Sequence, residues 1–242
     1  WDEGGLSGSG SCSYVQSERD ALYERAFDML KSGGLVYPCY CSRADLRAAS
    51  APHASDGITP YLGTCRHLSV EEQEAKSLER KPSYRFAMPS GEMMFVDGNY
   101  GECCFDMQRD CGDFVVRRAD GNFAYQLAVV VDDALMGVTE VVRGYDLLSS
   151  TPQQILLYRA LEYAEPTFYH LPLLVSKRGQ RLAKRDEGTD MGYLREHYTP
   201  QRLVGHIMWL VGLNAKDEPM ILDEALSVFD PKAMPKENIT VV

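Results

Sequence analysis

The pattern of hydrophobic and polar positions is clearest in the middle of this chain, where a β-branched apolar run at 128–131 stops on Asp132 and Asp133. A continuous apolar run that ends in polar residues is typical of a buried strand in a parallel sheet. The pattern predicts a second strand at 138–142, followed directly by the polar segment 143–146. Because open α/β sheets bind ligands beyond the carboxyl ends of such strands, these polar residues mark a candidate site.

Helix-start signals and helical spacing predict the elements around this region. Thr151 as N-cap, Pro152 in the first turn and Gln154 as capping-box partner indicate a helix that begins here. Ser17 and Thr199 are the predicted caps of two further helices with apolar stripes. The remaining predictions are a short strand at 35–40, helices at 69–81 and 223–229, and hairpins that pair 84–87 with 93–96 and 114–118 with 123–127.

Composition narrows the class of protein. The 242 residues are 45% hydrophobic and 25% charged, which is ordinary for one large or two small globular domains. No apolar run approaches the length of a membrane span, and no signal peptide is found. The net charge of −10 argues against nucleic-acid binding, unless a basic groove is confined to one part of the surface. Seven unevenly spaced cysteines fit a reducing cytoplasm better than a disulfide framework.

Three of the cysteines have the spacing of a metal site. Cys39 and Cys41 form a C-x-C pair, and Cys65 follows across a loop, which matches a structural zinc knuckle. A closed tetrahedral site needs a fourth ligand, and the candidates are Tyr61, His53 and His67. Spacing alone favours a histidine, because imidazole is a common zinc ligand; the alternative is three unligated thiols in a small core. A second group is expected to be buried and inert, because adjacent cysteines chelate one ion poorly: Cys103, Cys104 and Cys111.

A dense basic segment at 177–185 stands out in this acidic chain. A cationic loop near the carboxyl ends of a sheet suits a polyphosphate ligand, whereas a solvated loop without a ligand is the simpler alternative. Asp132 and Asp133 have the chemistry of a magnesium pair, but we interpret them as strand-end caps.

The segments VVVDDALMGVTEVVRGYDLLSSTPQQ, LPLL and RLAKR together resemble the second half of the catalytic domain of class I glutamyl-tRNA synthetases. RLAKR stands where that family has its KMSKS-type loop. The resemblance implies an α/β class I Rossmann-type catalytic domain, interrupted by a zinc-containing α+β insertion of the kind that holds the acceptor end of tRNA. The implied parts are the end of the first half of the nucleotide-binding fold at 1–37, the insertion at 38–112, the second half with the loop at 113–198, and a C-terminal helical tail at 199–242. The HIGH motif of the family is not found, and we expect it to precede Trp1.

The resemblance also implies roles for single residues. Tyr125 and Arg143 match the residues that hold the amino acid, and an arginine fork with a tyrosine hydroxyl suits a glutamate carboxylate. Lys184 matches the catalytic loop lysine that meets ATP, which enters with magnesium; a mobile cation there stabilises charge as the adenylate forms. Without the resemblance, a structural ion pair of Arg143 with Asp146 or Asp133 is as good an interpretation as substrate binding.

A short branch of the family, the glutamyl-queuosine tRNA(Asp) synthetases, carries C-x-C followed by Y-x-x-x-C. Cys39, Cys41, Tyr61 and Cys65 match this pattern with a longer intervening loop, and the branch makes the tyrosine the fourth zinc ligand. The chain ends at Val242 without a long helical anticodon-binding region, which also favours the branch. It implies ATP-dependent activation of L-glutamate and transfer to queuosine in the anticodon loop of tRNA(Asp), by a cytoplasmic monomer with no membrane partner. The alternatives are the catalytic part of a synthetase that charges tRNA(Glu), and a non-catalytic tRNA-binding paralogue.

Overall fold

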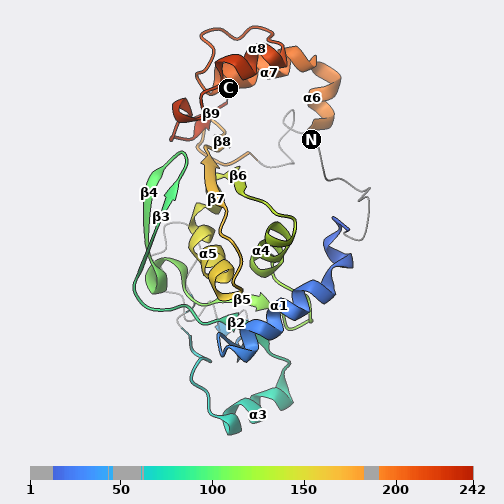
Figure 1. Ribbon diagram of the computed structural model, residues 1–242, viewed down its shortest axis with the longest axis vertical. Coiled ribbons are helices and arrows are strands. Elements are labelled where there is room, and N and C mark those ends of the chain that lie inside the picture. Colours follow the sequence, from blue (N-terminus) through green and yellow to red (C-terminus); the bar gives the residue numbers. More distant parts are fainter. Residues whose placement is uncertain (1–12, 43, 46–60, 62, 183–190, 242) are drawn as a thin grey trace. The chain divides into compact units, whose positions relative to one another are not determined.

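The computed structural model describes residues 13–42, 44–45, 61, 63–182 and 191–241 (Figure 1). The chain divides into two compact units. The first comprises Trp1–Phe95, Cys104–Thr139 and Ser149–Pro166, and the second comprises Val96–Cys103, Glu140–Leu148 and Thr167–Val242. Each unit therefore combines segments that are far apart in the sequence.

Three helices form most of the core of the first unit: α1 (Asp20–Ser32), α4 (Tyr125–Leu135) and α5 (Thr151–Ala160), with α4 in contact with both others (Figure 1). A short 3₁₀ helix, η1 (Gln16–Glu18), precedes α1. The predicted start of α5 is confirmed, but its N-cap is Ser150 and makes no side-chain capping bond. The side chain of Gln154 is buried and donates to Gln126 of α4 instead of completing a capping box.

The strand predicted at 128–131 is wrong, because these residues lie in the middle of α4. Val130 and Val131 are buried on the helix face that packs into the unit, and a four-residue apolar run does not distinguish a buried helix from a buried strand. Asp132 is consequently no strand-end cap. It is buried within α4, where Arg19 Nε donates to it at 2.7 Å and Tyr23 at 2.9 Å. These bonds join α1 to α4, so the role of Asp132 is structural.

An antiparallel sheet completes the first unit, with the order β1 (Val36–Cys39), β2 (Ser83–Phe86), β5 (Phe114–Arg117). Helix α3 (Val70–Glu79) lies between β1 and β2 in sequence and begins with a capping box of Ser69 and Glu72. The first predicted hairpin is wrong, whereas the second is confirmed only around its turn, where the Arg118 amide donates to the Asn122 carbonyl and the Ala124 amide to the Val116 carbonyl. β2 pairs with the distant β1 and β5 rather than with the strand that follows it, and Phe123 makes only a single bridge to Arg117 before α4 begins.

A second sheet has the order β4 (Gly101–Asp106), β3 (Glu92–Asp97), β7 (Thr167–Leu171), β6 (Glu140–Gly144), and the division between the units falls within β3 and β4. The strand predicted at 138–142 is confirmed as β6, shifted by two residues. β3 and β6 both run parallel to β7, with Asp97 opposite Phe168 and Arg143 opposite His170. This register brings the carboxyl ends of three strands to one edge of the sheet.

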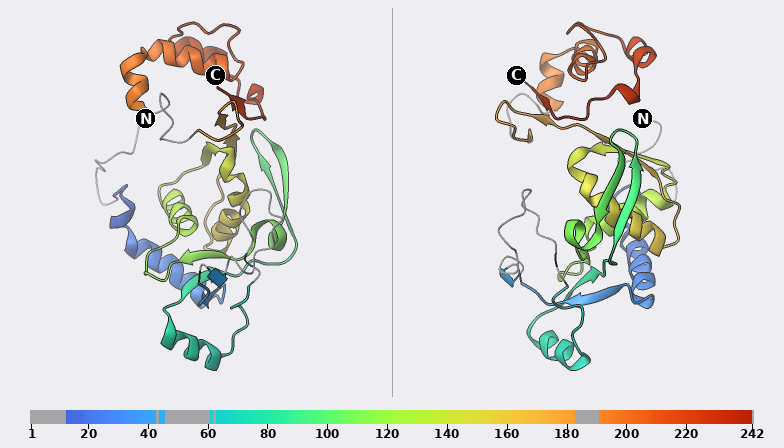
Figure 2. Two further views of the ribbon diagram at one scale, coloured as in Figure 1. Left: turned by 180° about the vertical axis from the view of Figure 1, so that it is seen from behind. Right: turned by 90° about the vertical axis from the view of Figure 1, so that its left-hand side faces the viewer.

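The rest of the second unit is mainly helical. Helix α7 begins at Pro200, and Thr199 caps it as predicted by accepting from the Arg202 amide. Helix α7 (Pro200–Leu210) contacts helix α8 (Leu222–Val228) (Figure 2, orange and red), and Met208 of α7 and Ala225 of α8 are buried. None of the described helices is both long and apolar enough to cross a membrane. The remaining described elements are η2 (Met107–Cys111), η3 (Tyr145–Ser150), β8 (Leu174–Val175), α6 (Met191–His197), η4 (Pro231–Ala233) and β9 (Ile239–Thr240). Strand β9 pairs with β8 in parallel.

Candidate functional site

Arg143, predicted to bind the amino-acid substrate, lies near the end of β6 in the second unit. Its Nε donates to His170 Nε2 at 2.9 Å, and one terminal nitrogen donates to the Leu147 carbonyl at 3.3 Å. Its guanidinium carbon also lies 5.2 Å from the centre of the Phe168 ring. Because the β6–β7 register sets Arg143 opposite His170, two strands of one sheet fix this guanidinium.

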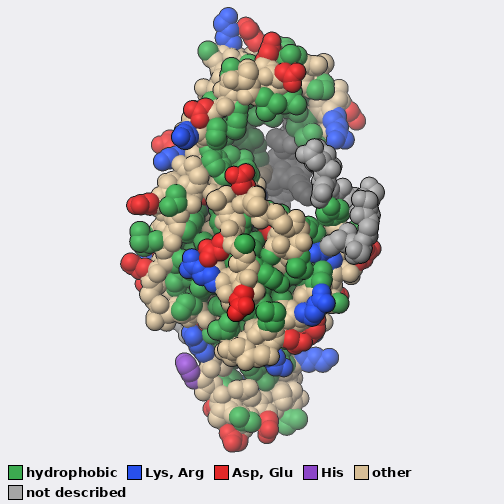
Figure 3. Space-filling view, in the orientation of Figure 1, with side chains coloured by type: hydrophobic (Ala, Val, Ile, Leu, Met, Phe, Trp, Pro, Cys, Tyr) green, Lys and Arg blue, Asp and Glu red, His purple; other side chains and the backbone are tan. Residues whose placement is uncertain are grey.

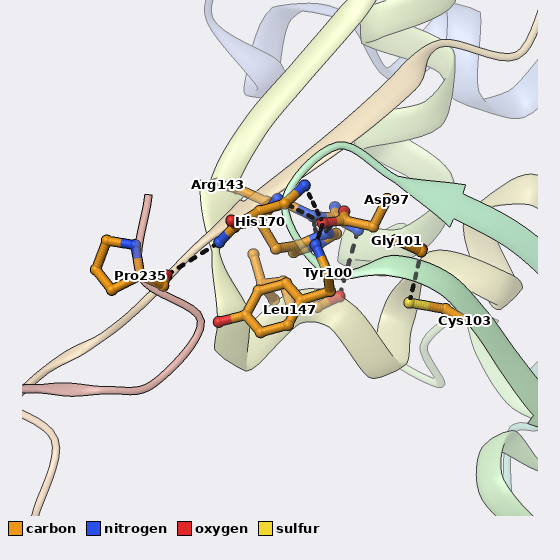
Figure 4. Close-up of polar contacts among 9 residues, drawn as sticks. Asp97, Tyr100, Gly101, Cys103, Arg143, Leu147, His170 and Pro235 are labelled. Atoms are coloured by element: carbon orange, nitrogen blue, oxygen red, sulfur yellow. Dashed lines mark hydrogen bonds and ion pairs between the residues drawn. The ribbon is translucent and has the colours of Figure 1, made fainter. Parts of the chain in front are cut away.

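His170 joins Arg143 to Asp97 (Figure 4). Its side chain is fully buried, and its Nδ1 lies 2.6 Å from Asp97 Oδ2. Arginine Nε can only donate, so Nε2 of His170 must accept, and the ring proton then sits on Nδ1 and is donated to Asp97. Burial lowers the pKa of His170, and the charge of Arg143 lowers it further against the opposing effect of Asp97. The histidine is therefore neutral, with a single tautomer that the neighbours select.

Asp97 anchors this series of hydrogen bonds at the end of β3. Its Oδ1 accepts from the backbone amides of Asn99 and Tyr100 at 3.0 Å each and from the His170 amide at 3.3 Å. Burial by itself raises the pKa of Asp97, but the hydrogen bonds from the His170 ring and the three amides outweigh it and hold the pKa below its ordinary value. Asn99 Nδ2 donates to the carbonyls of His170 and Pro235, which ties this turn to β7 and to the segment after η4 (Pro231–Ala233).

The basic segment of the sequence begins beside the end of β6. Its residues 176–180 form a tight turn in which the Gly179 amide donates to the Ser176 carbonyl at 2.8 Å. Arg181 then forms an ion pair with Asp146, three residues after Arg143. The structure thus brings the start of the RLAKR loop to the strand end that carries the predicted substrate residue. Lys184 and Arg185 lie outside the described residues, so the catalytic role predicted for Lys184 stays a prediction.

Tyr125 is the first residue of α4 in the first unit and is 51% exposed. The next residue, Gln126, is held by side-chain hydrogen bonds with Gln153 and Gln154 of α5, which fixes the start of the helix. Tyr125 and Arg143 fall in different units, and their predicted joint role in substrate binding stays a prediction.

The predicted zinc ligands converge in the first unit. The sulfur atoms of Cys39, Cys41 and Cys65 all lie within 4.8 Å of one another, and the Tyr61 hydroxyl oxygen lies 3.5 Å from Cys39 Sγ and 3.4 Å from Cys41 Sγ. A tetrahedral zinc with bonds of about 2.3 Å to sulfur and about 2.0 Å to oxygen separates its ligands by about 3.5–3.8 Å. The three sulfurs and the phenol oxygen therefore fit a closed zinc site. His67 is exposed, and His53 lies outside the described residues.

Arg85 is buried behind these ligands. Its Nε donates to Cys39 Sγ at 3.4 Å, its guanidinium carbon lies 4.0 Å from the centre of the Tyr61 ring, and one terminal nitrogen donates to the Asp113 carbonyl at 2.8 Å. Burial by itself raises the pKa of Cys39, but hydrogen bonds from Tyr61, the Cys41 backbone and Arg85 outweigh it and lower that pKa. Burial raises the pKa of Cys41 to about 11 and also raises that of Tyr61. Arg85 and Tyr61 therefore favour the ionised form of Cys39 over that of Cys41, and a bound dication would favour deprotonation of its thiol ligands.

The second group of cysteines is not uniformly buried, contrary to expectation. Cys111 is buried, but Cys103 is half-buried and Cys104 is exposed, because β4 presents alternate residues to solvent. Among the described residues, the group of thiols, histidines and carboxylates with metal-site geometry is that of Cys39, Cys41 and Cys65.

Asp97 and His170 are the functional candidates that the sequence did not reveal. Asp97 ends the apolar segment MMFVD, and His170 interrupts the apolar segment FYHLPLL near its start. A polar residue at or near the carboxyl end of a predicted strand was the signal that could have indicated a site. It could not indicate that the two side chains meet, because they come from strands 73 positions apart.

The sequence is similar to that of known proteins over nearly its whole length. Residues 5–240 match the family described as tRNA synthetases class I (E and Q), catalytic domain. A glutamyl-Q tRNA(Asp) synthetase of Symbiobacterium thermophilum is 50% identical over 245 residues, which cover all of this chain and 76% of that protein. A protein of the same name from Nitratidesulfovibrio vulgaris is 44% identical, with coverages of 97% and 74%. A glutamate–tRNA ligase 1 of Halorhodospira halophila is 40% identical, with coverages of 96% and 52%.

The fold is also similar to that of a solved protein. The crystal structure of a glutamate tRNA ligase from Elizabethkingia meningosepticum, in complex with its amino acid, matches with a TM-score of 0.78 at 25% identity. The match covers 99% of this chain and 53% of the ligase, so the chain spans about half the length of that relative.

Proposed function

The chain belongs to the family of class I glutamyl- and glutaminyl-tRNA synthetase catalytic domains, and from this premise we propose that the protein activates L-glutamate with ATP and transfers it to queuosine in the anticodon loop of tRNA(Asp). One observation carries the choice of acceptor. The glutamyl-Q tRNA(Asp) synthetase relatives are 50% and 44% identical and are covered over three quarters of their length, whereas the glutamate–tRNA ligase is 40% identical and is covered over half.

The glutamate side chain is the group that Arg143 recognises in this proposal. A guanidinium binds a planar carboxylate through two parallel N–H bonds, which a lysine or a neutral amide partner does not reproduce. The hydrogen bonds to His170 and Leu147 support the assignment, because they hold Arg143 in one orientation before any ligand arrives. Tyr125 supplies a hydroxyl to the same substrate.

ATP is the second substrate, and it enters with magnesium. The α-carboxylate oxygen of glutamate attacks the α-phosphorus of ATP, the bond to the β-phosphate oxygen breaks, and pyrophosphate leaves. Lys184 stabilises the negative charge that grows on the phosphates during this step. The ion pair of Arg181 with Asp146 supports this placement of the loop, because it fixes the start of the loop beside the end of β6. Transfer of the glutamyl group to queuosine then releases AMP.

A structural zinc ion is proposed at Cys39, Cys41, Tyr61 and Cys65, within an insertion over 38–112. The fit of the four ligand atoms to zinc distances supports it. A bound zinc would cross-link β1 to the segment around residues 61–65, which is not continuous with β1 in sequence. Its role would be in folding of the insertion rather than in the chemistry of glutamate.

The RNA partner is the anticodon loop of tRNA(Asp), whose splayed single-stranded bases a protein pocket can hold. The exposed side chains of Arg178 and Arg181, with Lys184 and Arg185 of the same loop, would neutralise its phosphates. On the face drawn in Figure 3, acidic and basic side chains are interspersed. The basic loop is the proposed electrostatic contact despite the net charge of −10, because a local group of cations can bind phosphates in an acidic chain.

The test is transfer of radiolabelled glutamate by the full-length protein to three RNAs: tRNA(Asp) with queuosine, tRNA(Asp) without it, and tRNA(Glu). The proposal predicts ATP-dependent labelling of the first alone. Labelling of tRNA(Glu) alone would instead show a tRNA(Glu)-charging synthetase. No labelling, together with no glutamate-dependent exchange of pyrophosphate into ATP, would show a non-catalytic paralogue.

A further inference from the structure

We propose that Asp97 and His170 are positioning residues for glutamate recognition, which hold the Arg143 guanidinium in the orientation that accepts the substrate carboxylate. This inference rests on the proposed function, since it takes Arg143 to be the glutamate-binding residue. Nothing in the family description or in the names of the relatives assigns a role to either residue.

The three side chains form a series across the sheet, one from each of three neighbouring strands. Asp97 comes from β3, His170 from β7 and Arg143 from β6, in the order in which these strands lie side by side. The two joining distances are 2.6 Å and 2.9 Å (Figure 4). The N–H groups of a guanidinium lie in a rigid plane, so a bond that fixes Nε also fixes the directions of the other N–H groups.

The series has one direction of donation, and Asp97 sets it. Oδ1 of Asp97 accepts three backbone amides, which leaves Oδ2 to accept the proton of His170 Nδ1. With that proton on Nδ1, Nε2 has its lone pair directed at Arg143 Nε. The opposite tautomer would set an N–H of the histidine against the N–H of the arginine and push the guanidinium away.

The burial of Asp97 and His170 argues for a positioning role and against direct contact with the substrate. Asp97 and His170 are 1% and 0% exposed, so neither reaches a substrate in solution without rearrangement of the sheet. Arg143 is only partly buried. The two buried residues therefore act through Arg143. A purely structural Asp–His pair would stabilise the sheet and leave substrate affinity unchanged, which is the alternative that an experiment must exclude.

The key variant is Asp97→Asn. The three backbone amides keep the amide oxygen of the new side chain at the Oδ1 position, so its NH₂ group replaces Oδ2 and donates to His170 Nδ1. The histidine must then carry its proton on Nε2, facing Arg143 Nε. We expect the glutamate KM in ATP–pyrophosphate exchange to rise by about 10- to 100-fold, as for loss of a hydrogen bond to a charged group, with the ATP KM unchanged.

Two substitutions of His170 divide the series into halves. Glutamine places an amide oxygen near the position of Nε2, where it accepts from Arg143, whereas asparagine places its amide near Nδ1 and reaches only Asp97. His170→Gln should therefore raise the glutamate KM less than His170→Asn does. The matched control is His206→Gln, which removes another histidine–aspartate contact of the same unit, 3.1 Å to Asp217, and should leave the glutamate KM unchanged.

Nitrogen-15 NMR of histidine-labelled full-length protein supplies a second readout, with the His170 signal assigned by its loss in His170→Gln. We expect a neutral Nδ1–H tautomer in the wild type and an Nε2–H tautomer in Asp97→Asn. A wild-type Nε2–H tautomer or imidazolium would overturn the inference. So would unchanged glutamate KM values in Asp97→Asn and His170→Asn when the wild type is active. A wild type without glutamate-dependent exchange would instead overturn the proposed function, and the inference with it.

Discussion

The thiol cluster of the first unit and the Asp97–His170–Arg143 series of the second both consist of buried and half-buried polar groups, but their atoms are arranged differently. Cys39, Cys41, Cys65 and Tyr61 direct their polar atoms toward one another, with contacts of 3.4–3.5 Å. Asp97, His170 and Arg143 instead lie in a line, and each donor meets an acceptor. A convergent set offers its atoms to the cation proposed above, whereas in the linear set every donor already has an acceptor.

The two arrangements differ in what keeps their side chains in place. The cluster is held by β1 and the segment around Cys65, so a bound zinc, as proposed, would add its binding free energy to the stability of this region. The series is held by three strands and by the backbone amides on Asp97, so its geometry exists before the substrate binds. We therefore expect metal removal to act on folding of the first region and single hydrogen-bond changes to act on substrate affinity in the second.

The largest effect is expected from removing one of the proposed zinc ligands. In Cys39→Ser, the full-length protein should lose its bound zinc and several kcal/mol of stability, because a structural zinc contributes its binding free energy to folding. Zinc content by elemental analysis and thermal unfolding measure this. Cys104→Ser is the matched control, since that thiol is exposed and outside the cluster, and it should keep the zinc. A wild type without zinc would contradict the metal site itself.

The next effect concerns the end of the linear series. Arg143→Lys should lower kcat/KM for glutamate by about 10- to 150-fold, because a lysine cannot donate to His170 and also form a two-bond contact with a carboxylate, a loss of about 1.5–3 kcal/mol. Pyrophosphate exchange with glutamate and with glutamine measures this, and the preference for glutamate should shrink. Arg159→Lys, in an exposed ion pair with Glu165, is the control. Unchanged activation kinetics would make Arg143 only a structural residue.

A smaller effect distinguishes the candidates for the fourth zinc ligand. Tyr61→Phe removes only the hydroxyl that lies 3.4 Å from Cys41 Sγ and leaves the ring under Arg85 in place. We expect zinc affinity to fall by about tenfold or more, because loss of a ligand should weaken binding at least as much as loss of a residue that only hydrogen-bonds to a ligand. Competition with a coloured chelator measures it. Zinc held equally well by Tyr61→Phe would assign the fourth position to a histidine.

The convergent region was largely predictable from sequence, and the linear one was not. Cys39, Cys41 and Cys65 lie within 27 consecutive positions, so their spacing suggested a shared metal site, and the structure brings the three sulfur atoms together. Tyr61 was identified as the fourth ligand by the resemblance, because spacing alone favoured a histidine. The series spans positions 97–170, and its contacts depend on the register of three strands. Arg143 was found by resemblance to a family, but its partners were not, because a sequence does not state which strands are neighbours.

The errors in the predicted fold have the same origin. The apolar run at 128–131 satisfies a strand pattern and a buried helix equally, and contacts of α4 with α1 and α5 decide for the helix. β2 has a turn and a strand directly after it, yet it pairs with β1 and β5, which lie far from it in sequence. Local signals were sufficient for the helix predicted at 69–81 and for the cap at Thr199, but not for the capping box predicted at Thr151 and Gln154, because Gln154 bonds to Gln126 of another helix.

The central claim is that glutamate held by Arg143 is transferred to the queuosine base of tRNA(Asp). The most direct measurement is mass spectrometry of the nucleosides released from queuosine-containing tRNA(Asp) after reaction with the full-length protein, ATP and glutamate. The account predicts conversion of queuosine to its glutamyl ester and an unmodified 3′-terminal adenosine. Glutamate on the 3′-terminal adenosine, with queuosine unchanged, would contradict it.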